Sequence, residues 1–127
     1  MSHHHPRVLT IVNEAHESDR INDLLTKHQI RTFSYVNFEQ CMDQIKFIRP
    51  DVIVLDGKTP SMDGTSVESL IKGDQATHTI PVALLSDSED SCVHLGENAV
   101  IHQPVREDNL MDVINCLMNS TYFDDHI

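Results

Sequence analysis

The sequence predicts an α/β fold, with one doubly wound parallel sheet of five strands that are each followed by a helix. Short β-branched and apolar runs alternate along the chain with stretches whose apolar residues recur at helical spacing. The apolar run at residues 52–55 has no polar alternation, which is typical of a central parallel strand buried on both faces. The chain has 127 residues, the length of one domain.

The first half of the chain contains three expected strands and two expected helices. Compact apolar or β-branched runs predict strands over residues 8–12, 31–36 and 51–55. The apolar stripes of the two helices comprise Ile21, Leu24, Leu25 and His28, and then Phe38, Cys41, Met42 and Ile45. Asn37 is the expected cap of the second helix, and Arg49-Pro50 stops it.

The second half continues the alternation. Strands are expected over residues 80–85 and 99–102, and a capping box at residues 65–68 opens a helix that Gly73 ends. A short fourth helix is expected over residues 89–95. The last helix carries Leu110, Val113, Ile114 and Leu117. We therefore expect a His-rich, disordered segment at residues 1–6, a folded domain at 7–118 and a polar tail at 119–127.

Composition excludes several function classes. The formal net charge of −11 argues against nucleic-acid and anionic-membrane binding, since both need clustered Lys and Arg. No apolar run approaches the length of a membrane span, and no signal peptide is evident. Three cysteines without paired spacing are typical of reduced thiols, so we expect a cytoplasmic protein. Residues 86–127 hold nine acidic residues, and Arg106 is the only Lys or Arg among them.

Polar residues gather where the expected strands end. In a parallel α/β sheet, binding and catalytic sites form at the carboxyl ends of the strands. The candidate residues at those ends are Asn13, Glu14, Asp56, Ser86 and Gln103.

One segment is specific enough to suggest a family. Residues 51–64 read DVIVLDGKTPSMDG, a buried strand ending in Asp56, then Pro60 and a Met-Asp-Gly turn. This segment resembles the phosphoacceptor segment of response regulator receiver domains. Matching segments follow in order at residues 8–14, 80–86 and 96–104, so the resemblance covers roughly residues 6–118. It implies a flavodoxin-like (βα)5 fold with strand order 2-1-3-4-5.

The resemblance also implies a chemistry. Asp56 would accept a phosphoryl group from a histidine kinase or phosphotransfer protein, with no enzymatic turnover beyond this self-phosphorylation. Mg²⁺ would be held by the carboxylates of Asp56 and Glu14, by Asn13 and by the backbone carbonyl of Lys58. The Ser86 hydroxyl would bond a phosphoryl oxygen. Cations are needed because a phosphoryl dianion beside carboxylates is strongly repelled.

The sequence departs from the family pattern in ways that weaken this chemistry. Asn13 replaces one acid of the metal-binding pair, and Gln103 stands at the usual lysine position before a proline. Lys58 is a candidate substitute cation, or else a solvated surface lysine. The segment between Ser86 and Gln103 is shorter than is usual in the family, which predicts a shortened fourth helix. Val100 stands where the family has its aromatic switch residue.

These departures leave several functions open. The chain is a receiver with weak phosphorylation, or a pseudo-receiver that binds a partner without phosphorylation and keeps Asp56 as an inherited carboxylate. A hydrolase of the haloacid dehalogenase class would need a second Asp where Lys58 stands, and flavin binding lacks a phosphate cradle after the first strand. The acidic region 86–127 is either a solvated face, a docking surface for a basic output partner, or a homodimer surface.

Overall fold

A five-stranded parallel sheet forms the centre of the molecule, with strand order β2-β1-β3-β4-β5. The computed structural model describes residues 6–12, 14–35, 42–56, 67–86, 99–102 and 105–126. The strands are β1 (Arg7–Ile11), β2 (Arg31–Tyr35), β3 (Val52–Asp56), β4 (Val82–Ser86) and β5 (Ala99–His102). The helices are α1 (Ala15–Lys27), α2 (Met42–Ile48), α3 (Val67–Gly73) and α4 (Glu107–His126). The predicted fold class and strand order are confirmed.

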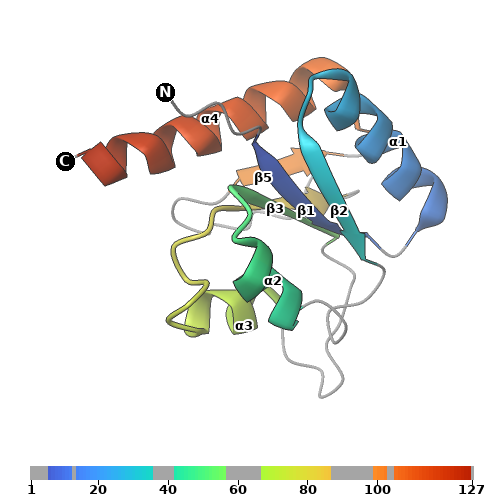
Figure 1. Cartoon of the computed structure of the whole chain (residues 1–127). Coiled ribbons are helices and arrows are strands. Elements are labelled where there is room, and N and C mark those ends of the chain that lie inside the picture. The colour runs from blue at the N-terminus through green and yellow to red at the C-terminus, as the bar shows by residue number, and fades with distance from the viewer. Residues whose placement is uncertain are drawn as a thin grey trace.

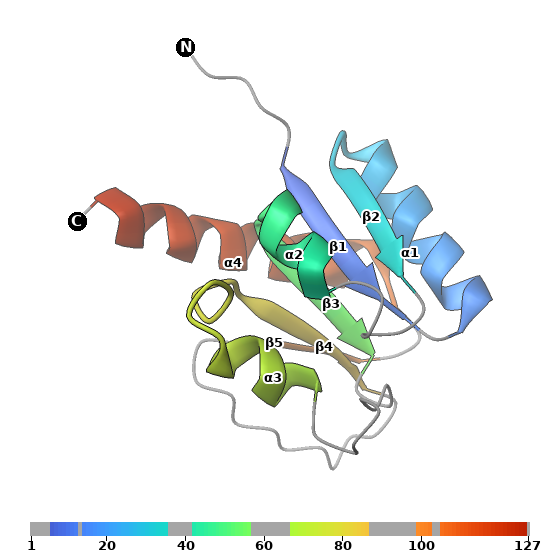
Figure 2. The same ribbon diagram turned by 60° about the horizontal axis from the view of Figure 1, so that its bottom comes forward.

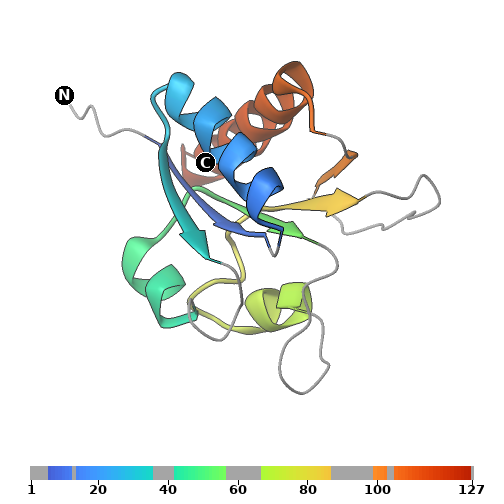
Figure 3. The same cartoon turned by 90° about the vertical axis from the view of Figure 1, so that its right-hand side faces the viewer.

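Helices cover both faces of the sheet, as Figures 1 and 3 show. Helices α1 and α4 lie on one face, where Ile21 of α1 and Ile114 of α4 pack with alternate residues of the strands. Helices α2 and α3 lie on the other face, where Ile45 and Ile71 pack against the remaining strand residues. Strands β1, β3 and β4 therefore bury both of their faces, which is why their apolar runs lack polar alternation, whereas the edge strand β2 has no fully buried residue.

Strand β3 is the most enclosed part of the sheet. All five of its residues are buried, and it pairs with β1 on one side and β4 on the other. The strand arrows in Figure 2 point toward the same side of the sheet, as the parallel pairing requires. This arrangement brings the last residue of β3, Asp56, to the carboxyl edge of the sheet.

Two sequence expectations about helix ends need correction. His28 does not belong to the buried face of α1, because the helix ends at Lys27 and His28 is its exposed C-cap. Residues 119–126, expected to be a polar tail, continue α4 to His126, and the far end of α4 extends past the sheet in Figures 1 and 2. No Gly or Pro follows Pro104, so nothing in the sequence stops the helix.

Other expected features lie outside the described residues. They are the His-rich start of the chain, the caps expected at Asn37 and Thr65, and the short helix at residues 89–95. Within the described ranges, no helix combines the length and apolar character needed to cross a membrane.

An ion-pair cluster joins the end of α1 to the start of α4. The Glu107 carboxylate lies 2.8 Å from His28 Nε2 and 3.2 Å from Lys27 Nζ. These contacts, first with His28 and then with Lys27, hold the pKa of the Glu107 carboxyl below its usual value. The acid near a helix N-terminus and the bases at a helix C-terminus also complement both helix dipoles. Part of the acidity of region 86–127 is therefore paired within the chain.

Helix α1 ends on a residue in the left-handed conformation. Gln29 has φ 64°, and two backbone bonds close the helix end, from Gln29 N to Thr26 O (2.9 Å) and from Ile30 N to Leu25 O (3.0 Å). Glycine is the usual residue at this position, because a Cβ is crowded there.

Replacing Gln29 by Gly is expected to raise the free energy of unfolding by about 0.5–1 kcal/mol, because the left-handed strain is relieved. Urea denaturation measures the change. Gln44 is exposed inside α2, so Gln44→Gly is the matched control and should destabilise the protein by about 1 kcal/mol. A loss of stability in Gln29→Gly would contradict the strain argument.

Candidate functional site

Asp56 is the central residue of the candidate site. It is the last residue of β3, is 7% exposed, and is the only charged residue with a buried side chain in the described part of the chain. A carboxylate with so little exposure is costly unless a specific environment compensates it. The strand below it is rigid, because β1 and β4 pair with β3 on both sides. Asp56 is thus a fixed carboxylate at the edge where parallel sheets carry their sites.

The backbone brings Ser86 to the same edge. Asp56 pairs with Leu85 of β4, so Ser86 ends that neighbouring strand one residue further on. Ser86 in turn pairs with His102, which ends β5. The expected juxtaposition of Asp56 and Ser86 at adjacent strand ends therefore agrees with the strand register. The side chains of Ser86 and His102 lie outside the described set.

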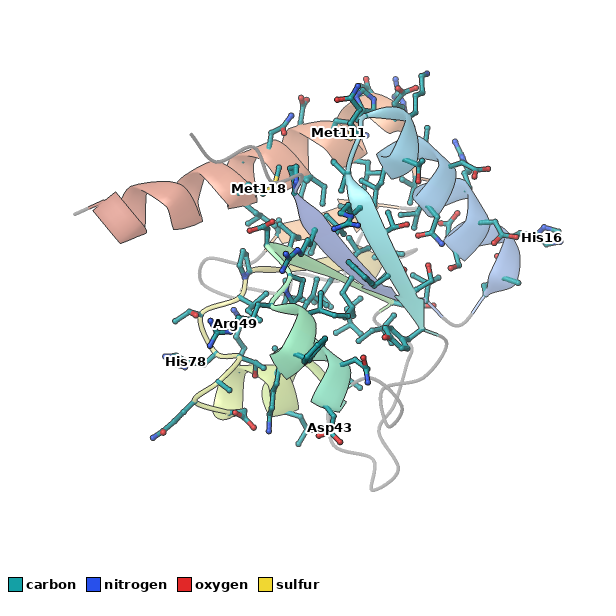
Figure 4. The ribbon with its side chains drawn as sticks, in the orientation of Figure 1. His16, Asp43, Arg49, His78, Met111 and Met118 are labelled. Carbon is teal, nitrogen blue, oxygen red and sulfur yellow. The ribbon has the colours of Figure 1, made fainter. Side chains whose placement is uncertain are left out.

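Glu14 has a structural role that the sequence reasoning missed. Its carboxylate caps α1, since the backbone N–H groups of His16 and Glu17 donate to its two oxygens at 2.9 and 2.8 Å. Figure 4 shows His16 at this end of α1, on the outer side of the molecule. The available sequence signal was an acidic residue directly before the first helical residue, Ala15. If Glu14 also bound a metal ion, its two oxygens would have to contact both the ion and the N–H groups at the start of α1.

The cap makes stability depend on pH. The backbone N–H of Glu17, followed by that of His16, lowers the pKa of the Glu14 carboxyl from 4.5. Because the folded pKa lies below the unfolded one, the ionised cap stabilises the fold above the unfolded pKa. This contribution is lost as the pH falls through the folded pKa.

Replacing Glu14 by Gln is expected to lower stability at pH 7 and to have a shrinking effect as the pH falls below the unfolded pKa of 4.5. The measurement is urea denaturation of both proteins at neutral and acidic pH. Glu17→Gln, in the first turn of the same helix, is the control for removal of a negative charge near the helix N-terminus. A stability gap for Glu14→Gln that does not change with pH would contradict the capping argument.

Three candidate residues lie outside the described residues. Asn13, Lys58 and Gln103 each fall in a segment next to the described strand ends. Within the described residues, no group of three or more His, Cys, Asp or Glu side chains is placed to hold a metal ion. The structure thus supplies the position of Asp56 and the backbone position of Ser86, and the roles of the other candidates remain predictions.

Comparison with known proteins identifies the matching family. A family model for the response regulator receiver domain matches residues 8–115. A protein-glutamate methylesterase/protein-glutamine glutaminase from Bacillus licheniformis is 31% identical over 107 residues, which is 77% of this chain. The chain spans only 29% of the length of that relative.

Solved structures show the same fold. A response regulator from Chloroflexus aurantiacus matches with a TM-score of 0.82 and 16% identity, covering 91% of this chain and 99% of that one. The receiver domain of a sensor histidine kinase from Pseudomonas aeruginosa matches with a TM-score of 0.81 and 17% identity, with the same coverage of 91% and 99%. That second structure has a magnesium ion coordinated in its active site cleft.

Proposed function

Because the chain belongs to the response regulator receiver domain family of two-component signalling, we propose that Asp56 is its phosphoacceptor. The observation that carries the proposal is the placement of this carboxylate, buried to 7% exposure, at the carboxyl end of central strand β3. The backbone of Ser86 ends the adjacent strand. A hydroxyl there is suited to bond a phosphoryl oxygen.

The proposed reaction is a phosphoryl transfer. A carboxylate oxygen of Asp56 attacks the phosphorus of a phosphohistidine on a histidine kinase or phosphotransfer protein. The P–N bond breaks as the P–O bond forms, the electron pair returns to the imidazole, and the product is an acyl phosphate on Asp56. No other turnover is assigned to this chain. The location we propose for this exchange is the cytoplasm.

The oxygen atoms available at this edge are only partly suited to binding magnesium. Carboxylate, amide and carbonyl oxygens suit Mg²⁺, and Asp56, Glu14, Asn13 and the Lys58 backbone carbonyl are the oxygens that would hold it. When bound, the ion neutralises charge that develops on the phosphoryl group. However, both Glu14 oxygens already accept backbone hydrogen bonds, and Asn13 brings no charge. We therefore propose a weak magnesium site.

The same features favour a second candidate function. Gln103 at the usual lysine position supplies no positive charge, and Lys58 is the remaining candidate cation at this edge. A pseudo-receiver that binds its partner without phosphorylation keeps the fold and needs neither cation nor metal. In that case the acidic region 86–127 is the surface for a basic output partner, whose binding weakens as salt is added, or the surface for a second copy of the chain.

Intact mass measurement separates the two functions. The full chain is incubated with Mg²⁺ and a small acyl phosphate, and we expect a gain of one phosphoryl group in the wild type. Asp56→Asn should show no gain, because the nucleophilic oxygen is lost. Asp43 is an exposed carboxylate on α2, labelled in Figure 4, and Asp43→Asn is the matched control that should behave like the wild type. No mass gain in the wild type, or an equal gain in Asp56→Asn, would overturn phosphorylation at Asp56 and leave the pseudo-receiver.

A further inference from the structure

The amino edge of the sheet, opposite the edge that carries Asp56, is rich in positive charge. Helices α1, α2 and α3 each carry a lysine in the last turn, namely Lys27, Lys46 and Lys72. Each has a partner: Lys27 pairs with Glu107, Lys46 with Asp74, and Lys72 donates to the carbonyl of Ile80 at 2.8 Å. These lysines offset the negative helix ends, so their presence has a structural explanation.

Two further arginines on this edge, Arg31 and Arg49, have no partner of this kind among the described residues. Arg31 starts β2 and pairs in register with Arg7 of β1, and the Arg7 Nη1 donates to the carbonyl of Ile48 at 2.8 Å. Arg49 follows Ile48 directly, so Arg31 is in register with Arg7 and Arg49 follows the residue whose carbonyl Arg7 contacts. Both are exposed, and neither guanidinium has an acceptor among the described residues.

An exposed aromatic side chain stands beside Arg49. Phe47 is 85% exposed and is the one large apolar side chain so exposed in the described part of the chain. Ile45 and Ile48 face the core, so Phe47 projects from the outer side of α2. Exposing an aromatic ring has no stabilising effect on the fold, and aromatic residues and arginine are the types enriched at binding hot spots.

The backbone at Arg49 closes helix α2. Arg49 has φ 53°, and its N–H donates to the carbonyl of Ile45 at 2.9 Å, so this left-handed residue ends α2 as Gln29 ends α1. Arg31 also lines an open hollow of about 720 Å³, together with Thr26, Gln29, Ile30, Thr32 and Phe33.

We propose that this surface, formed by Arg31, Phe47 and Arg49, docks an acidic segment of a protein partner that also presents an apolar side chain. Guanidinium groups bind carboxylates through paired hydrogen bonds, and Phe47 and the hollow beside Arg31 offer apolar contact. The net charge of −11 does not prevent this contact, because charges are screened beyond about 8 Å at physiological salt.

The docking surface lies away from the phosphoacceptor edge. Figure 4 shows Arg49 and His78 on one side of the molecule and His16, at the start of α1, on the other. A partner held at Arg31, Phe47 and Arg49 therefore does not cover the carboxyl edge of the sheet where Asp56 lies. The proposal goes beyond the phosphorylation function and does not depend on it.

A defined peptide probe tests the proposal with the full chain. The probe is a fluorescein-labelled peptide of Asp, Glu and Leu residues, and its partner peptide replaces each acid by Asn or Gln. Fluorescence anisotropy should show binding of the acidic peptide alone, which weakens with added salt. Arg31→Gln with Arg49→Gln should weaken binding at least about tenfold, and Phe47→Ala about fivefold.

The matched control removes two positive charges elsewhere. Arg20 on α1 and Arg106 before α4 are also exposed, and Arg20→Gln with Arg106→Gln should change binding less than about twofold. Equal losses in the two double variants, an unchanged affinity in Phe47→Ala, or no binding would overturn the proposal. So would a salt-sensitive dimer of the chain that Arg31→Gln with Arg49→Gln dissolves, since the occupant would then be a second copy.

Discussion

Replacing Ile53 by Ala is expected to lower the free energy of unfolding by about 3–4 kcal/mol, a large part of the stability of a small domain. Ile53 is fully buried in β3 and lies between Leu9 of β1 and Val82 of β4 in the strand register. The substitution removes three carbon atoms from the core between the sheet and helices α2 and α3. Rigid pairing on both sides of β3 limits how far the neighbours can close the cavity.

Urea denaturation at neutral pH measures this loss. Phe47→Ala is the matched control, because it removes a larger apolar side chain that is 85% exposed and should change stability by less than about 0.5 kcal/mol. Comparing the two variants separates the effect of burial on stability from the effect of side-chain size. A cost for Ile53→Ala below about 1 kcal/mol would mean that the centre of the sheet is less closely packed than the burial of Ile53 indicates.

The sequence predicts the sheet well for a local reason. Burial on both faces leaves a continuous apolar run, and the run at residues 52–55 is visible without any knowledge of its partners. Strand boundaries shift by a residue or two, since β1 begins at Arg7 and β3 includes Asp56. The exact end of a strand is harder to predict, because a polar residue there can either pair with the neighbouring strand or begin the loop.

Contacts between distant segments could not be predicted in the same way. His28 fits the helical spacing of Ile21 and Leu25, but the helix ends one residue earlier and His28 pairs with Glu107 instead. That contact joins residues 79 positions apart and depends on how α4 crosses the sheet. The spacing of apolar residues within one helix gives no information about how α4 crosses the sheet.

The candidate site likewise has one residue that the sequence could place and one whose role it could not predict. Asp56 could be placed from the sequence, because a buried strand that ends in an acid puts that acid at the carboxyl edge of the sheet. The capping role of Glu14 could not be distinguished from metal binding, because both use the same oxygens at the same place. Only the positions of the His16 and Glu17 N–H groups show that these oxygens accept hydrogen bonds within α1.

Replacing Gln103 by Lys is expected to raise the rate of phosphorylation at Asp56 by about tenfold, which corresponds to about 1.4 kcal/mol of added charge stabilisation. The gain stays incomplete because Asn13 still leaves the metal site one negative charge short. Adding Asn13→Asp should therefore raise the rate further, and the response to Mg²⁺ concentration should move to lower concentrations in the double variant only. Time courses of intact mass with a small acyl phosphate measure both effects.

Gln44→Lys is the control for this pair, since it adds the same charge at an exposed site on α2 and should leave the rate unchanged. If Gln103→Lys alone reaches the rate of the double variant, Asn13 does not limit the metal site and the weakness lies in the missing cation. If neither variant changes the rate while Asp56→Asn still abolishes labelling, Gln103 is not beside the phosphoryl group. Lys58 is then the remaining candidate cation, and Lys58→Gln should remove most of the residual rate.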